Sequence, residues 1–132
     1  MDPFPDEALL RELFGVEPAL LHPNVPWRDN ALSFESRNGH DQLECLIEPV
    51  YGTMTLRWTR DGHELLYLDL TRVRGVEAEK FRGRESLVAY FDEQTGLKPL
   101  RIQVRPAAHV SWGTRDDADR AADAGSQRQL PL

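Results

Sequence analysis

The residues best suited to catalysis or metal binding are four histidines and one cysteine, and their spacing forms no familiar site. His22, His40, His63 and His109 show no HxH or HxxxH spacing, and Cys45 is the only cysteine. Four zinc ligands would therefore have to come together from distant loops. No glycine-rich loop joins a strand to a helix, as a nucleotide phosphate site requires. The sequence thus predicts neither a metal nor a cofactor.

The densest group of basic side chains lies in the second half of the chain and comprises Lys80 and four arginines, Arg72, Arg74, Arg82 and Arg84. Guanidinium groups bind anions well, and the neighbouring aromatic residue Phe81 adds a feature found on nucleic-acid-binding surfaces. Charged side chains on strand edges also deter aggregation, which is the commoner reason for such a pattern. The four arginines are therefore a candidate anion site, with a solvated strand edge as the alternative.

Charge is distributed unevenly along the 132 residues. Residues 1–50 hold ten acidic and three basic side chains, a net charge of −7, whereas the whole chain carries −6. A negative protein repels nucleic acids and anionic membranes. The acidic first half would suit a basic protein partner, and a solvated surface is the alternative.

Most of these side chains must be positioned by strands, because apolar and polar residues alternate along much of the chain. The clearest element is a hairpin over residues 53–70 that turns at Asp61-Gly62. The parity of the leucines in its second arm favours a three-residue loop, residues 60–62, over a two-residue loop. That register gathers one set of side chains on the buried face: Met54 opposite Leu68, Leu56 opposite Leu66, and Trp58 beside them.

A second hairpin precedes it, with strands over residues 30–36 and 42–48 and the turn sequence Asn38-Gly39 between them. A two-residue type I′ loop at this turn would place two pairs of core residues opposite each other: Phe34 with Leu43, and Leu32 with Cys45.

Three carboxylates of this hairpin are the candidate partner-binding residues. Glu35 and Glu44 alternate with the core residues of their strands and should project outward. Asp41 lies next to the turn, so we expect it near the other two.

The remaining pattern completes a mainly antiparallel fold. Residues 6–14 predict a short helix that begins at the N-cap Asp6 and ends before Gly15, and residues 17–21 would add one more turn. Further strands are expected over residues 76–81 and 86–91 and, interrupted at Pro106, over residues 100–112. Trp27 and Trp112 read as core residues, although Trp27 could also anchor a partner.

The predicted fold class is α+β, mainly β: an antiparallel sheet of about six to eight strands, as a sandwich or half-barrel, with a short N-terminal helix. Residues 1–114 would form one domain. Residues 115–132 are rich in alanine, aspartate and arginine, which predicts a polar tail that is weakly helical or disordered.

Four short motifs follow one another along the chain in an informative order. Leu13-Phe14-Gly15 ends the helix, and residues 26–31 read Pro-Trp-Arg-Asp-Asn-Ala. Residues 68–81 contain a Gly-Val pair between two strands, and residues 100–105 form a late strand. This order resembles the immunity protein 50 family of bacterial polymorphic toxin systems, with Arg28 where the family motif has histidine. The similarity covers about residues 9–112.

The resemblance implies a non-catalytic protein that binds a toxin and blocks it in its own cell. The partner would be the cognate toxin, for which a basic nuclease domain would suit the acidic first half, and the location would be cytoplasmic. A single cysteine and the absence of a long apolar run agree with that location. Two alternatives remain: a small enzyme with a site assembled from scattered His, Asp and Arg, and a structural subunit of a larger assembly.

Overall fold

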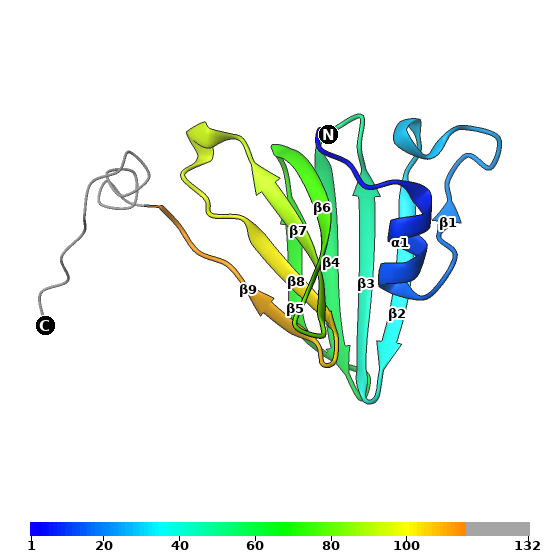
Figure 1. The fold of residues 1–132 in the computed structure, drawn as a ribbon, viewed down its shortest axis with the longest axis vertical. Coiled ribbons are helices and arrows are strands. Elements are labelled where there is room, and N and C mark those ends of the chain that lie inside the picture. The colour runs from blue at the N-terminus through cyan, green and yellow to red at the C-terminus, as the bar shows by residue number, and fades with distance from the viewer. Residues whose placement is uncertain (116–132) are drawn as a thin grey trace, which may run out of the picture.

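The computed structural model describes residues 1–115, which form two antiparallel sheets and a short N-terminal helix (Figure 1). The first sheet has the order β1-β2-β3-β4-β5 and the second β6-β7-β8-β9. The strands are β1 (Ala19–Leu20), β2 (Leu32–Asn38), β3 (Asp41–Glu48), β4 (Thr53–Arg60), β5 (His63–Leu70), β6 (Val73–Phe81), β7 (Arg84–Phe91), β8 (Leu100–Arg105) and β9 (His109–Ser111). The helical elements are α1 (Glu7–Phe14) and the 3₁₀ turns η1 (Trp27–Asp29) and η2 (Glu93–Thr95). The predicted mainly antiparallel β class is confirmed; the tail predicted from residue 115 lies outside the described residues, apart from Arg115.

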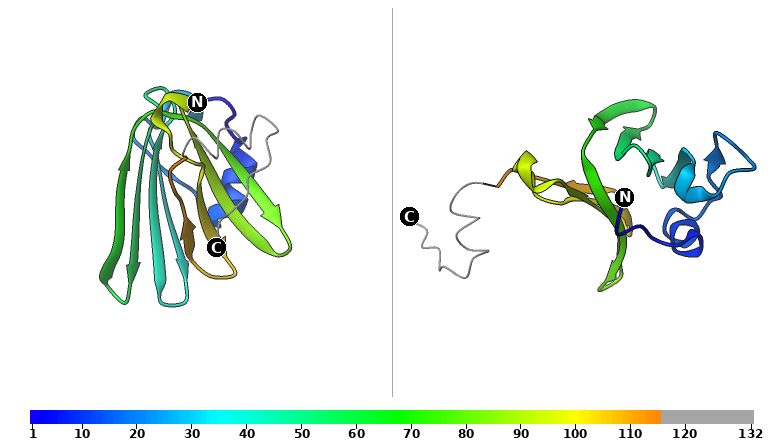
Figure 2. Two further views of the ribbon diagram at one scale, coloured as in Figure 1. Left: turned by 90° about the vertical axis from the view of Figure 1, so that its left-hand side faces the viewer. Right: turned by 90° about the horizontal axis from the view of Figure 1, so that it is seen from above.

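The two sheets face each other, and α1 lies at one side of the space between them, against β2, β6 and β7 (Figures 1 and 2). The core fills this space with apolar side chains from both sheets and from the helix. Phe14 of α1 stacks on Phe34 of β2 with ring centroids 4.4 Å apart, and Trp27 meets Phe34 edge-on. Trp27 is therefore a core residue, as predicted.

Helix α1 forms because its ends are capped and one of its faces is apolar. The Asp6 carboxylate accepts a hydrogen bond from the backbone N–H of Leu9 at 2.8 Å, and Gly15 ends the helix with a φ of 71°. Leu10, Leu13 and Phe14 are buried, as an amphipathic helix requires. The extra helical turn predicted over residues 17–21 is wrong, because β1 pairs there with β2.

The first hairpin keeps the predicted faces but shifts its pairing. The loop consists of Gly39 and His40, so that Asn38 pairs with Asp41, Phe34 with Cys45, and Leu32 with Ile47. Of the two loop residues, only Gly39 has a positive φ, which makes the turn type II′ instead of the predicted type I′. The Asn38 amide is engaged elsewhere, because its Nδ2 donates to Val104 O and Pro106 O, at 3.2 and 2.6 Å. Because this link between the two sheets holds Asn38 at the end of β2, the loop is Gly39-His40 instead of the predicted Asn38-Gly39.

The central hairpin has a two-residue loop, so the predicted three-residue loop is wrong. Asp61 and Gly62 both have positive φ, as a type I′ turn requires. A bulge at Leu65 then adds one residue to β5 and returns the even-numbered leucines to the core side. The resulting pairs are Met54 with Leu70, Leu56 with Leu68, and Trp58 with Leu66. Trp58 faces the predicted side, but it is only half-buried.

The second sheet begins where Arg72, with a φ of 58°, redirects the chain from one sheet to the other. Gly75 in β6 lies under the N-terminal segment, in which Asp2 N donates to Arg74 O and Pro3 O accepts from Val76 N, both at 2.8 Å. Residues 100–112 form two short strands, β8 and β9, as the position of Pro106 predicted. Trp112 was expected in the core, but it is 38% exposed and stacks on Phe91.

Candidate partner-binding face

The strands of the first sheet direct their polar side chains away from the core. Along β2, Leu32 and Phe34 are fully buried, whereas Ser33, Glu35 and Arg37 between and beyond them are exposed. Side chains alternate along a strand, and residues directly opposite each other share a face. The polar surface therefore continues across β3, β4 and β5. We call this surface the outer face of the first sheet.

One row of the outer face runs through four paired strands: Glu35, Glu44, Arg57 and Tyr67. Glu35 and Glu44 stand directly opposite each other, an arrangement in which like charges repel. The Nε2 of Gln42 donates to a carboxylate oxygen of each, at 3.2 Å for Glu44. One amide thus holds two carboxylates side by side, and their remaining oxygen lone pairs are available to a partner.

Arg57 is the cation of this row, and it is shared among several groups. Its Nε lies 3.0 Å from Glu64, and its Nη1 lies 3.8 Å from Glu44. The guanidinium carbon also lies 5.2 Å from the ring centroid of Tyr67. Since Arg57 divides its charge among these contacts, it neutralises the carboxylates only in part.

The outer face as a whole is acidic. Its register positions hold more carboxylates than guanidinium groups: Glu35, Glu44, Glu48, Glu64 and Asp69 against Arg37 and Arg57. Hydrogen bonds and ion pairs from a basic partner could therefore be accepted across several strands at once.

Asp41 lies apart from Glu35 and Glu44. It shares the parity of the core residues of β3, and its side chain is only 13% exposed. Its carboxylate accepts hydrogen bonds from Arg60 Nε and Trp58 Nε1, both at 2.9 Å. The hydrogen bond from Arg60, followed by that from Trp58, holds the pKa of Asp41 below its ordinary value.

The four arginines predicted as an anion site are not gathered in one place. Arg72 and Arg74 lie at the start of β6, beside the acidic residues Asp92 and Glu93 in a shallow hollow. Arg82 and Arg84 lie at the other end of the β6–β7 hairpin, about 26 Å from Arg74 at the usual rise of a strand. Arg74 and Arg82 each lie over an aromatic ring, those of Tyr90 and Phe81.

The four histidines and the cysteine lie on different strands and loops. His40 lies at the tip of the first hairpin, with its Nδ1 2.7 Å from an Asp61 carboxylate oxygen at the tip of the next. Cys45 is buried, and this burial raises the pKa of its thiol to about 12, so it is inert at neutral pH. Within residues 1–115, no group of three or more His, Cys, Asp and Glu side chains is placed to hold a metal ion.

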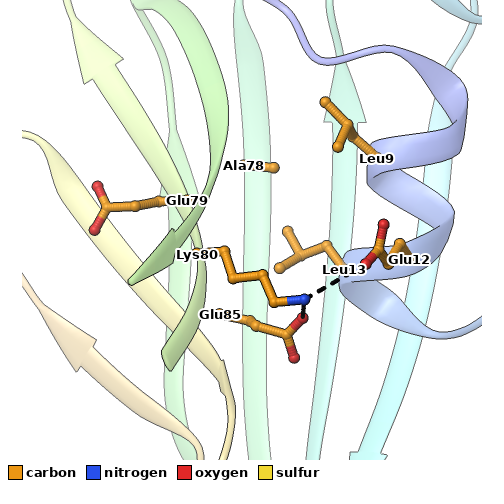
Figure 3. A pocket seen from close by; sticks show the side chains of 7 residues that line it. All are labelled: Leu9, Glu12, Leu13, Ala78, Glu79, Lys80 and Glu85. Atoms are coloured by element: carbon orange, nitrogen blue, oxygen red, sulfur yellow. Dashed lines mark ion pairs between the residues drawn. The ribbon is translucent and has the colours of Figure 1, made fainter. Parts of the chain in front are cut away.

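A small hollow lies between α1 and the β6–β7 hairpin (Figure 3). Lys80 reaches across it, with Nζ 3.7 Å from both Glu12 of the helix and Glu85 of β7. Leu9 and Leu13 supply its apolar wall on the helix side. The hollow joins the helix to the sheet through paired charges and is too small to hold more than a very small ligand.

The residues of β4 and β5 on the outer face were missed as candidates in the sequence. Arg57 contacts both Glu64 and Tyr67, and these residues extend the carboxylate row across the sheet. The signal was present in the parity of the hairpin, because Arg57 alternates with Leu56 and Trp58. Half of the Tyr67 side chain is exposed, as is half of that of Leu65 beside it.

Comparisons with known proteins identify the fold. No family model matches the sequence, and no curated protein matches it. Among solved structures, the chain is similar to one in a contact-dependent growth inhibition toxin–immunity protein complex from Klebsiella pneumoniae 342, with a TM-score of 0.70. The match covers 83% of this chain and 94% of that chain, at 15% sequence identity. At this identity the similarity establishes a shared fold.

Proposed function

We propose that this chain is an immunity protein that neutralises a cognate toxin by direct contact, without catalysis. The observation that carries the proposal is the fold shared with a chain of a toxin–immunity protein complex. That complex has two kinds of component. The motif order that resembles the immunity protein 50 family favours the immunity component and, within it, that family.

The outer face of the first sheet is the proposed contact surface. It presents Glu35 and Glu44 side by side and extends the row through Arg57 to Tyr67. A partner with basic side chains would meet the carboxylates, and the exposed aromatic ring would supply apolar contact area. Asp41 would contribute from the hairpin tip by fixing Arg60, because its own oxygens already accept two donors.

A basic toxin domain, for example a nuclease, would suit this acidic surface. Opposite charges raise the rate of encounter, which favours an inhibitor that must act before the toxin finds its substrate. Such an inhibitor would act in the cytoplasm. Among residues 1–115, no helix is long and apolar enough to cross a membrane.

The test is co-expression with the product of the neighbouring gene. We expect that product to stop growth when expressed alone, the present chain to be harmless alone, and growth to return when both are made. Toxicity that persists beside the wild-type chain would overturn the immunity function. A chain that is itself toxic would assign it to the toxin component instead.

A pair of charge-reversal variants tests the proposed face separately. Glu35→Lys with Glu44→Lys should leave the fold intact, since exposed charges contribute little to stability. Binding should weaken, and the remaining affinity should depend less on salt. The matched control is Asp29→Lys with Glu93→Lys, which changes the net charge equally at exposed positions outside the outer face. If both double variants lose affinity equally, overall charge matters and the face is wrong; protection by the wild type would still support the function.

A further inference from the structure

In the part of the chain that the structure describes, the two sheets have four edge strands, and three of them offer little to a new strand. β1 has two residues and β9 has three. β6 is longer, but the N-terminal segment already occupies part of its edge through the hydrogen bonds of Asp2 and Pro3. β5 differs, because it has eight residues and, within residues 1–115, it pairs only with β4, on one side. Figure 2 shows the β4–β5 hairpin at the border of the molecule.

Free edges of sheets invite pairing with other chains, and proteins usually protect them with bulges, lysines or prolines. β5 has one such device, the bulge at Leu65, which lies near the turn. Beyond the bulge the stretch Leu66–Leu70 is regular and contains neither lysine nor proline. Leu66 and Leu68 on its inner side are only half-buried, and Tyr67 on its outer side is 49% exposed.

The regular stretch is complementary to itself when it is reversed. In an antiparallel pair centred on Leu68, Leu66 meets Leu70 and Tyr67 meets Asp69. We call the line along which two such β5 strands would meet the seam. On the core-facing side of the seam, all side chains are then leucines. On the outer side, a phenol hydroxyl that can donate a hydrogen bond stands opposite a carboxylate that can accept one.

The neighbouring register is poorer. Centring the pair on Tyr67 brings the bulged Leu65 opposite Asp69 and Glu64 opposite Leu70, so that two carboxylates face apolar side chains. The register centred on Leu68 uses only residues beyond the bulge.

We propose that β5 pairs with β5 of a second copy of this chain, antiparallel and centred on Leu68. The two first sheets would join into one continuous sheet of ten strands. Because opposite residues share a face, the twofold axis is perpendicular to the sheet, and both outer faces lie on the same side. The dimer therefore leaves both carboxylate rows accessible, and it does not depend on the identity of a toxin.

The first test is sedimentation velocity of the full chain over a range of concentrations. The wild type should shift from monomer to dimer as its concentration rises. Leu68→Lys should remain monomeric, because a charge would enter the apolar seam. The control Val50→Lys, which makes the same kind of change at an exposed apolar residue outside β5, should dimerise like the wild type. A wild type that stays monomeric throughout, or a Leu68→Lys variant that still dimerises, overturns the proposal.

A cysteine variant keeps the test independent of any folding defect in Leu68→Lys. At the centre of an antiparallel pair, the two Cα atoms lie about 4.5–5.5 Å apart, within reach of a disulfide. Leu68→Cys should therefore form a covalent dimer under mild oxidation. Thr55→Cys on the interior strand β4 should not, and the native Cys45 is buried. Equal cross-linking of the two variants, or none at position 68, would exclude this seam.

Discussion

Asp41 joins two hairpins through a single carboxylate. It belongs to β3, and its two donors, Trp58 and Arg60, belong to β4. The tip of the next turn is joined to the same region, because Asp61 N donates to His40 O at 3.1 Å. The side chains at this end of the sheet thus fix the relative positions of the two turns.

The lowered pKa of Asp41 predicts how its contribution depends on pH. A native pKa below the ordinary 3.8 means that stabilisation is complete above that pH and is lost as the pH falls through the native value. Asp41→Asn should therefore unfold at a lower urea concentration than the wild type at pH 7, and the two midpoints should converge in acid. Asp69→Asn, at an exposed position of β5, is the control and should follow the wild type. A difference that persists undiminished in strong acid would contradict the role of the charge.

The sequence predicted some of these residues better than others. Glu35 and Glu44 could be placed outward because strand alternation determines the face of a residue without knowledge of the register. Asp41 has the parity of Leu43 and Cys45, which was evidence that it turns inward. Its proximity to the turn suggested otherwise, and only the contact with Trp58 shows why a carboxylate is tolerated there.

At the scale of elements, β6 depends on a residue without a side chain. A Cβ atom added to Gly75 would lie 2.6 Å from Pro3 Cδ and 2.7 Å from the backbone of Asp2. The N-terminal segment can follow the edge of β6 only because this space is empty. Gly75 is therefore required for a close approach of two backbones, and its own φ is not positive.

Gly75→Ala should displace the N-terminal segment from β6. We expect a loss of about 1–3 kcal/mol in the free energy of unfolding, the usual range for overpacking. Hydrogen exchange should become faster at Asp2 and Val76, whose amides donate in this pairing. Gly113→Ala is a matched control, because its added Cβ meets only the Lys98 side chain at 3.7 Å. Equal stability of the two variants would show that the segment adapts without loss.

Helix α1 is attached at its C-terminal end by Arg105. The Nη2 of Arg105 donates to Glu12 O and Leu13 O at 2.7 and 2.8 Å, and its Nε binds Glu85. Carbonyl groups at the end of a helix lack partners within the helix, so this guanidinium satisfies two of them. The hydrogen bond from Arg105 also holds the pKa of Glu85 below its ordinary 4.5.

Arg105→Gln should therefore raise the pKa of Glu85 toward its ordinary value and loosen the last turn of α1. A carboxyl NMR titration would follow the first effect, and hydrogen exchange at Gly15 the second. The control Arg101→Gln removes a more exposed ion pair, with Glu79, and should change neither. An unchanged titration of Glu85 would show that other groups set its pKa.

The sequence predicted most of the helix and strands and fewer of their pairings. The capping residues of α1 and the alternation of apolar and polar residues along the strands are local signals. Both were sufficient to predict that these elements form. The turn at Asn38 could not be predicted locally, since its amide binds carbonyl groups 66 and 68 residues away. In the central hairpin, the bulge at Leu65 shifts the parity of β5 in the same way as a three-residue loop would. The positions of the leucines alone therefore could not distinguish a two-residue loop with a bulge from a three-residue loop.

At the scale of the whole molecule, strands that are consecutive in the sequence pair with each other throughout each sheet, and the chain changes sheets only between β5 and β6. The hairpins can therefore form quickly, on the microsecond scale. The contacts that join the two layers are distant in the chain, since Arg105 reaches residues 92 and 93 positions earlier. We expect the docking of the layers, and not the pairing of strands, to limit the rate of folding.

A truncated chain that ends at Leu70 tests whether the first sheet can fold without the second. It contains every strand of the first sheet, but the apolar side formed by Leu32, Phe34 and Cys45 would have no second sheet to cover it. We expect the fragment to aggregate and to bind a hydrophobic dye, while the full chain does neither. A soluble, folded fragment would show that α1 alone covers this side.

The same strand order has a consequence for the time at which the protein becomes functional. A ribosome adds about 5–20 residues per second, so residues 71–111, which complete the second sheet, require about 2–8 s after β5 is complete. During this interval the strands that carry the proposed contact surface already exist, but the layer that stabilises them is still being synthesised. The proposed contact surface would therefore become stable only seconds after its own strands are synthesised. During that interval, an apolar surface is exposed, and a chaperone that shields it would raise the yield of active protein.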